Sequence, residues 1–207
     1  MDSFDGVTVS DGGPAAGLSL EALAATRVEP ARDGSPPDGA DLARILDVAT
    51  TVPDHGGLRP WRFVLVTGSG RERFGQALVE GQAEMQGADV PEGAVAKMRG
   101  KAFAAPCAVM VVASPRLESN VPEWEQVVSA SCTGYAIVLG ATALGLGGVW
   151  KSAPVLDSGP VRTLFGAAEH ERLLGWVNLG SPGQPSRKKG MYASGGVLET
   201  PVTVVGD

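Results

Sequence analysis

Apolar positions recur along the chain with two different periods, which predicts a mixture of helices and strands. Leu42, Ile45, Leu46 and Ala49 follow one another at spacings of three and four, as on the buried face of a helix. The stretch WRFVLVT at 61–67 is instead rich in β-branched and aromatic residues, which predicts a strand. The first structured part of the chain is therefore expected to be helical and to lead through a loop into this strand.

The segment after this strand predicts a helix and then a buried strand. Ser69 is expected to cap the helix, and Phe74 and Leu78 share one of its faces. The glycine-bounded stretch 87–93 is expected to end it. The run PCAVMVVAS at 106–114 is apolar throughout and is bounded by proline and Ser-Pro, as expected of a central strand covered on both faces.

The rest of the chain alternates in the same way. Strands separated by helices favour an α/β or α+β sandwich around a small sheet. The further expected elements are short helices over LEALAAT after Ser19 and through Lys97, a long helix from Pro122, a short strand or extended loop at 147–152, a helical turn at 161–165 and a last core strand at 173–180.

The long helix contains an uncharged run from Val127 to Leu146, which is long enough to cross a bilayer. Its many small and hydroxyl-bearing residues leave few large aliphatic ones, and no cluster of Lys or Arg flanks it. We therefore expect a helix buried on every side by protein, with a second subunit as one source of neighbours. A membrane-anchored protein that uses this segment is the alternative.

The composition is that of a single domain without a surface for nucleic acid. With 207 residues, 43% of them hydrophobic, the chain can fill one substantial core. Its 17 basic and 23 acidic side chains give a net charge of -6, which excludes a polycationic surface for a phosphate backbone. Two cysteines in apolar runs and an N-terminus without a signal-peptide pattern favour the cytoplasm. Residues 1–17 are rich in Gly, Asp and Ser and predict a flexible tail.

Several common chemistries lack their signature in this sequence. The glycines at 140, 145, 147 and 148 follow a helix and precede a strand, and position 150 is Trp rather than Gly, so they do not form a dinucleotide fingerprint. Two widely separated histidines and two apolar cysteines offer no metal-ligand spacing. Cys107 and Cys132 are expected to be packing residues rather than nucleophiles. The Glu-His-Glu triplet at 169–171 is expected to be a solvated turn.

Two segments combine a rigid backbone with polar side chains, as a ligand site requires. In VPDHGGLRPW at 52–61, prolines and glycines frame His55, which either binds a ligand or caps its own loop. In GGVWKS at 147–152, Lys151 and Ser152 offer a charge and a hydroxyl suited to phosphate, unless they merely end a strand.

Five segments occur in a characteristic order along the chain: PDHGGLRPWRFVLV, GRERF, VPEWEQVVSASC, GLGGVWKS and GWVNLGSP. Each is a weak signal alone, but five in this order and at these separations are specific. Together they resemble the nitroreductase family of oxidoreductases that depend on flavin mononucleotide (FMN), and especially its short single-domain members. The resemblance covers about residues 19–182.

This resemblance implies an α+β homodimer, a three-layer sandwich in which helices flank a small mixed sheet. It implies that the long helix lies at the subunit interface and that two flavins sit between the chains. His55 is then among the FMN contacts of one subunit, while Trp150, Lys151 and Ser152 approach the cofactor from the other. The implied chemistry is hydride transfer from NAD(P)H through flavin to a small-molecule electron acceptor, without a catalytic acid or base from the chain.

The family's usual Arg-Arg-Ser motif is matched only in part. The aligned triplet is TRV, so Arg27 keeps one cation for the phosphate, whereas the first cation and the hydroxyl are missing and Glu29 adds a negative charge. Thr51 replaces a family arginine that precedes the histidine loop. Because a lost charged hydrogen bond costs about 1.5 to 3 kcal/mol, two such losses can weaken FMN binding a hundredfold or more. The cations available to compensate are Arg32, Arg59 and Lys151.

Two functional hypotheses follow. The first is an FMN-dependent NAD(P)H oxidoreductase that reduces nitroaromatic or other electron-poor small molecules. The second is a non-catalytic dimer of the same fold with lost or altered flavin binding, acting as a binding or storage protein. The expected organisation is a tail at 1–17, a domain at 18–190 and a C-terminal extension at 191–207.

Overall fold

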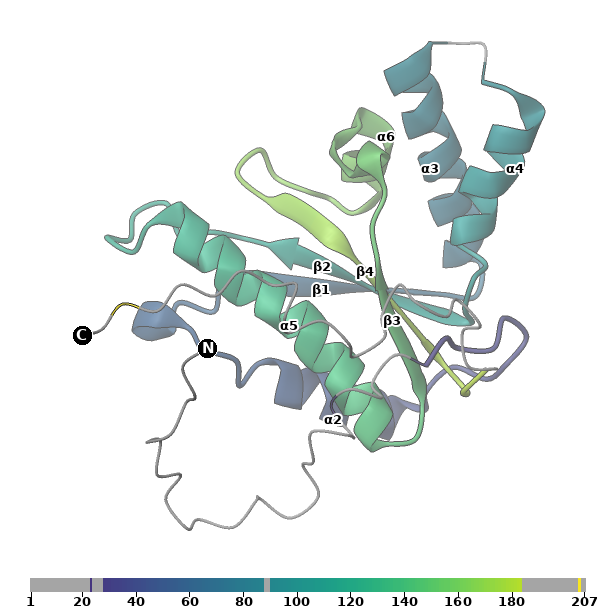
Figure 1. Cartoon of the computed structure of the whole chain (residues 1–207). Coiled ribbons are helices and arrows are strands. Elements are labelled where there is room, and N and C mark those ends of the chain that lie inside the picture. The colour runs from purple at the N-terminus through teal and green to yellow at the C-terminus, as the bar shows by residue number, and fades with distance from the viewer. Residues whose placement is uncertain (1–22, 24–27, 88–89, 184–204, 206–207) are drawn as a thin grey trace.

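The computed structural model of the chain describes residue 23, residues 28–87 and 90–183, and residue 205. Among these residues, one four-stranded sheet lies between two layers of helices (Figure 1). This arrangement confirms the expected α+β three-layer sandwich. The strands are β1 (Trp61–Thr67), β2 (Cys107–Ala113), β3 (Gly147–Lys151) and β4 (Arg172–Gly180).

The sheet has the strand order β1-β2-β4-β3, and its three strand pairs are all antiparallel. The expectation of a mixed sheet is therefore wrong for the part of the chain that the structure describes. β2 lies inside the sheet and each of its residues is buried, as its unbroken apolar sequence predicts. The bounds of β1 are those expected from the sequence.

Helices α2 (Gly39–Ala49) and α5 (Glu123–Ala143) cover one face of the sheet. The opposite face is covered by α3 (Gly70–Gln86), α4 (Glu92–Lys101) and α6 (Gly159–Leu164). Two short helical turns, η1 (His55–Gly57) and η2 (Pro154–Asp157), lie in the connections.

Each face of the sheet has its own apolar core. Beneath α3, the ring of Phe74 packs edge-on against Trp176 of β4, with ring centroids 5.2 Å apart. Beneath α2 and α5, Ile45 and Ile137 pack in one cluster with the residues of β2 and β4 that point the other way. Ser69 stands at the N-cap position of α3, as predicted, but it has helical backbone angles and its side chain makes no capping bond.

The pairing of β2 with β4 contains a bulge, and at this bulge the end of β3 lies close to Gly175 of β4. The register shifts between Val111 and Val112, and Gly175 opposite them has a φ of 129°. A Cβ at position 175 would lie 2.5 Å from the carbonyl oxygen of Lys151 and 2.6 Å from Nε1 of Trp150. Only glycine fits both this angle and this space.

The segment before α2 runs along the outer edge of β3. Val28 forms a β-bridge with Gly148, whose N–H donates to the carbonyl oxygen of Val28 at 2.9 Å. Two residues further on, Pro30 bridges Pro182 just beyond β4. This contact places Glu29 beside the strand that carries Trp150 and Lys151, two of the predicted site residues.

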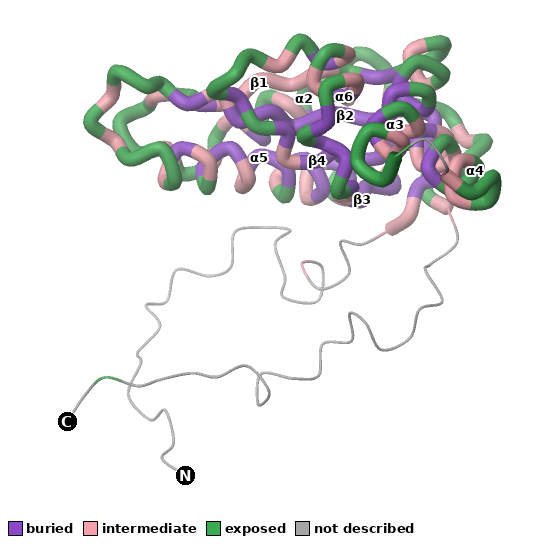
Figure 2. Tube along the Cα trace, turned by 90° about the horizontal axis from the view of Figure 1, so that it is seen from above, coloured by how far each residue is buried: buried purple, intermediate pink, exposed green. Residues whose placement is uncertain are grey.

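Helix α5 is long and apolar enough to cross a membrane by length and composition, yet it packs on β2, β3 and α2 as a core helix does. Its outer side is open in this single chain: Trp124, Val128 and Tyr135 are 66%, 53% and 50% exposed. The expectation of burial on every side is thus not met within one chain. Figure 2 shows exposed segments along α5 and buried ones along β2 and β4.

Several expectations lie outside the described residues. They include the tail at 1–17, the cation Arg27 and all of the extension at 191–207 except Val205. The helix over LEALAAT is described only at Leu23, which is helical. The domain boundaries therefore stay predictions.

Candidate functional site

Trp150 near the end of β3 is held by two glycines. A Cβ at Gly134 of α5 would lie 2.9 Å from the indole ring, and Gly175 of β4 leaves room for its Nε1. The ring therefore packs directly on the backbone of α5 and joins the core on that face. Such contact fixes the position of the two polar residues that follow Trp150 in the chain.

Lys151 ends β3 and forms an ion pair with Glu29 of the neighbouring segment. The distance from Nζ to Oε1 is 2.8 Å, and the two side chains are 36% and 39% exposed. The acidic residue that departs from the family pattern thus lies directly against the cation proposed for phosphate.

Lys151 and the exposed Ser152 line a cleft of about 710 Å³ between β3, β4 and α4. Among the described residues its lining includes four cationic side chains and no carboxylate. Burial is the main cause that lowers the pKa of Lys101, and the positive charge of Lys97 lowers it further. Both effects disfavour the charged form of a lysine. The cations are Arg32, Lys97, Lys101 and Lys151.

A buried donor without a partner also lines this cleft. Nε1 of Trp176 has no hydrogen-bond acceptor among the described residues, although the side chain is only 1% exposed. An unpaired buried N–H is costly, and it is commonly explained by a missing ion, water or ligand. Asn178, two residues along β4 and 2% exposed, lies on the same wall.

Sequence reasoning missed the contribution of α4 to this cleft. Lys97 and Lys101 are four residues apart and so lie on one face of a helix, a spacing that was available as a signal. Their approach to Lys151 depends on how α4 packs across the end of the sheet, which no local pattern reveals. Trp176 was predicted only as part of a core strand.

His55 lies in a different place from this cleft. It begins η1, and Nδ1 of its ring lies 2.8 Å from Oε2 of Glu125 in the first turn of α5. The side chain is 69% exposed. The structure thus brings Lys151 and Ser152 together at the cleft, whereas Trp150 packs against α5 on the other face of the sheet. His55 lies away from all three within one chain.

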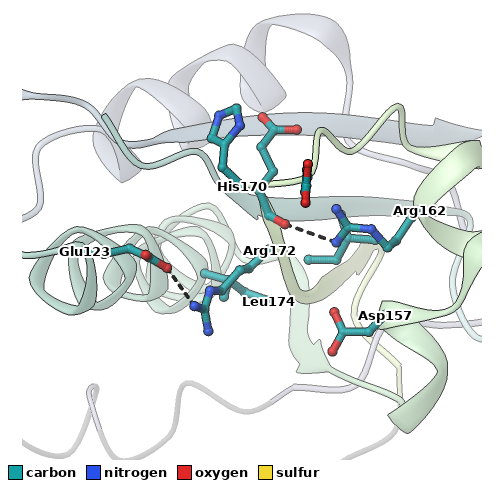
Figure 3. A pocket seen from close by; sticks show the side chains of 9 residues that line it. Glu123, Asp157, Arg162, His170, Arg172 and Leu174 are labelled. Atoms are coloured by element: carbon teal, nitrogen blue, oxygen red, sulfur yellow. Dashed lines mark hydrogen bonds and ion pairs between the residues drawn. The ribbon is translucent and has the colours of Figure 1, made fainter. Parts of the chain in front are cut away.

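A second cleft, of about 460 Å³, lies where the start of β4 meets α5 and α6 (Figure 3). Its two arginines are already bonded: Arg172 donates to Glu123 at 2.6 Å, and Arg162 donates to the carbonyl oxygen of Glu171 at 3.1 Å. The rest of the lining is mostly charged, and Asp157 lies on the same side of the view as Arg162 (Figure 3). These bonds make the cleft a structural junction.

The expectation of a solvated turn at 169–171 is wrong for Glu171. Its side chain is 6% exposed and accepts two hydrogen bonds of 2.7 Å from Arg62 of β1. The bonds from Arg62, first among the causes, lower the pKa of Glu171 to about 2. Glu171 therefore belongs to a buried ion pair that joins β1 to the loop before β4.

Neither metal binding nor thiol chemistry gains support from the geometry. Among the described residues no group of three or more His, Cys, Asp or Glu side chains could hold a metal ion. Both cysteines are free, and burial raises the pKa of the Cys107 thiol to about 11. Such a thiol stays protonated and unreactive at neutral pH.

A sequence profile described as the nitroreductase family matches residues 33–181. The chain belongs to the nitroreductase family. Membership confirms the resemblance seen in the sequence and the expected oxidoreductase class. The matched range includes His55, Trp150, Lys151 and Ser152 but ends before the C-terminal segment.

Curated relatives agree with this assignment. YdjA of Escherichia coli (strain K12), provisionally named an NAD(P)H nitroreductase, is 39% identical over 146 residues, which cover 70% of this chain and 78% of YdjA. A protein of Haemophilus influenzae with the same provisional name is 32% identical over 147 residues, 70% of this chain and 78% of that protein.

Solved structures share the fold. The nitroreductase-like family protein from Bacillus cereus superposes with a TM-score of 0.70 at 21% identity, covering 91% of this chain and 98% of that one. NfnB from a Sphingopyxis strain (HMH) is described as an FMN- and NADPH-dependent nitroreductase. It superposes with a TM-score of 0.61 at 20% identity, covering 80% of this chain and 89% of that one. At these identities the similarity is one of fold alone.

Proposed function

We propose that this nitroreductase-family protein is an FMN-dependent NAD(P)H oxidoreductase that reduces nitroaromatic or other electron-poor small molecules. The observation that carries the proposal is the cleft beside β3, whose lining includes four cationic side chains and Trp176, a residue whose buried N–H has no acceptor among the described residues. FMN has an anionic phosphate, which a cleft lined by cations suits. The names of YdjA and NfnB support the same cofactor and donor.

The residues present fit such a cofactor. Lys151 and Ser152 are the predicted contacts that line the cleft, and Arg32, Lys97 and Lys101 add charge to it. Arg27 remains a predicted phosphate ligand outside the described residues. Bound flavin supplies the hydride chemistry, so the chain has to bind, orient and shield it rather than provide an acid or base. The cationic lining also stabilises negative charge within the cleft.

We further propose that the working unit is a homodimer. His55 lies away from the cleft in one chain, so a site that includes both needs His55 of a second copy. Trp124, Val128 and Tyr135 give α5 an open apolar side on which such a copy can pack. This contact also explains why α5 has so few charges. With both cysteines free, we place the protein in the cytoplasm.

The second candidate is a non-catalytic dimer with lost or altered flavin binding, acting as a binding or storage protein. It is favoured by the ion pair of Lys151 with Glu29, which already neutralises one cation of the cleft. Thr26 and Val28, which stand where the family usually has Arg and Ser, also favour lost or altered flavin binding, because a cation and a hydroxyl are missing. Restoring these two residues separates the candidates: tighter FMN binding in the Thr26→Arg, Val28→Ser variant is expected only if the triplet limits affinity.

The deciding experiment is a titration of the purified full chain with FMN, followed by a spectrum and an assay of NAD(P)H oxidation with a nitroaromatic acceptor. The proposal predicts a yellow protein, saturable binding and oxidation that depends on added FMN. A colourless protein after soaking with FMN, with no oxidation above the flavin blank, contradicts it. Binding without turnover supports the second candidate.

A further inference from the structure

We propose that Glu125 is a positioning residue for His55. Its carboxylate holds the imidazole with Nδ1–H turned toward α5, so that Nε2 is the atom offered to the cofactor of a second subunit. This inference rests on the proposed function and adds to it a residue that does not itself touch the cofactor. It starts from the 2.8 Å contact between Nδ1 of His55 and Oε2 of Glu125.

The backbone around His55 is fixed by bonds within its own loop. Asp54 accepts the N–H of Arg59 on Oδ2 at 2.7 Å, and its carbonyl oxygen accepts the N–H of Gly57 at 3.1 Å. Gly56 and Gly57 have φ of 78° and 63°, a region that other residues rarely adopt. With the backbone held, the main freedom left to His55 is rotation of its side chain.

The backbone at Glu125 is held as firmly as the backbone at His55. It lies in the first turn of α5, where the helix dipole favours a carboxylate. The next residue, Gln126, is 3% exposed and bonds the chain before the helix, accepting the N–H of Arg116 at 2.7 Å and donating to the carbonyl oxygen of Val121 at 2.9 Å. The Glu125 side chain, 30% exposed, therefore projects from a fixed point.

The pairing determines which ring nitrogen carries the proton. An ionised carboxylate only accepts hydrogen bonds, so the hydrogen in this contact belongs to Nδ1. Nε2 is then left to accept a bond in the neutral ring or to donate one in the protonated ring. Because the side chain is 69% exposed, the ring is open to a partner from outside the chain. Carboxylates that orient a histidine through the other nitrogen are common in functional sites.

The same contact could instead serve only to tie the loop to α5, and the amide of glutamine distinguishes the two roles. Glu125→Gln keeps a hydrogen bond between loop and helix, but the amide can either accept from or donate to Nδ1. A tether survives this change, whereas control of the tautomer is lost. Glu123→Gln is the matched control, because Glu123 lies two residues earlier in the same helix and pairs with Arg172 on the surface.

The first measurement needs no cofactor. In a His170→Gln background His55 is the only histidine of the chain, and ring ¹⁵N shifts at a pH where the imidazole is neutral report its tautomer. We expect Nδ1–H in the parent and in Glu123→Gln, and a shift toward Nε2–H in Glu125→Gln and Glu125→Ala. An unchanged tautomer in both Glu125 variants overturns the inference.

The second measurement is FMN affinity of the full-length protein by fluorescence titration. We expect Glu125→Gln and His55→Ala each to weaken binding about tenfold, and the double variant to be no weaker than His55→Ala. A Glu125→Gln variant that binds as tightly as the parent, or a full additional loss in the double variant, overturns the positioning role. If the parent binds no FMN, the proposed function fails, whereas the tautomer data still decide whether Glu125 orients the ring.

Discussion

The guanidinium of Arg62 and the carboxylate of Glu171 form a two-pronged ion pair, with Nε and Nη2 each 2.7 Å from a carboxylate oxygen. Nη2 also donates to the carbonyl oxygens of Phe165 and Gly166 at 3.1 Å. Glu171 in turn accepts the N–H of Ala168 at 3.0 Å. One buried contact thus fixes β1, the end of α6 and the start of β4 relative to one another.

This ion pair predicts a loss of stability in acid. The bonds from Arg62 lower the pKa of Glu171 from 4.5 to about 2 in the folded chain. A depressed carboxyl pKa stabilises the fold above pH 4.5, and the contribution is lost as pH falls toward 2. Glu171→Gln is expected to lower the free energy of unfolding by about 3 kcal/mol at pH 7. The difference from the parent, measured by urea unfolding, is expected to shrink markedly at pH 3.

The control for this experiment is Glu72→Gln. Glu72 pairs with Arg99 on the surface, where both side chains are more than half exposed. Its loss is expected to change stability by less than about 1 kcal/mol. An equal gap between Glu171→Gln and the parent at pH 7 and pH 3 would show that the buried ion pair is not its cause.

Glu29 is expected to compete with an anionic ligand for Lys151, because its carboxylate lies 2.8 Å from the ammonium group. Replacing it by glutamine leaves the cation free for phosphate. Glu29→Gln is therefore expected to tighten FMN binding about three- to tenfold, measured by fluorescence titration at low salt. Glu72→Gln again serves as the control for a general change in charge. Weaker binding in Glu29→Gln would mean that Glu29 orients Lys151 rather than occupying it.

The cations of the cleft are expected to differ from other surface cations in their effect on FMN. Lys101→Met removes a charge whose lowered pKa reflects burial and the nearby Lys97. We expect about a tenfold to hundredfold loss of FMN affinity and a weaker dependence on salt. Arg73→Gln removes an exposed cation of α3 outside the cleft and is expected to leave affinity unchanged. An equal loss of FMN affinity in both variants would mean that the net charge of the protein, rather than the cleft, determines FMN binding.

The outer side of α5 is expected to hold two copies of the chain together. Val128 is 53% exposed there, between Trp124 and Tyr135 along the same helix. Val128→Lys places a charge in that contact and is expected to convert a dimer into a monomer in sedimentation experiments. Met85→Lys changes an equally exposed residue of α3 and is expected to leave the dimer intact. A parent protein that sediments as a monomer contradicts the proposed assembly itself.

The local features of the fold could be predicted from the sequence because their patterns are local. The apolar run of β2 and the β-branched and aromatic residues of β1 are short, local signals that predict strands, and both segments are strands in the structure. The direction of strand pairing depends on how the chain passes over the sheet, and no spacing encodes it. Ser69 stands at the N-cap position that the sequence predicts, but its helical backbone angles, and the missing capping bond, could not be predicted from its identity.

The candidate site divides in the same way. Lys151 and Ser152 could be found because they follow glycines and a tryptophan in one short segment. Lys97 and Lys101 reach the cleft only through the packing of α4. The partner of His55 was equally hidden, because Glu125 is 70 positions away in the chain. The burial of Glu171 depends on a strand more than a hundred positions earlier.

The prolines beside β3 affect the tendency of the protein to aggregate through its open sheet edge. An open strand edge invites sideways growth of the sheet from one molecule to the next. Here Val28 occupies part of that edge, and Pro30 and Pro182 bridge beyond it. Since proline has no N–H to donate, a further strand cannot extend a regular ladder along these positions. The segment from Val28 to Pro30, which also places Glu29 beside Lys151, is therefore expected to reduce aggregation at this edge of the sheet.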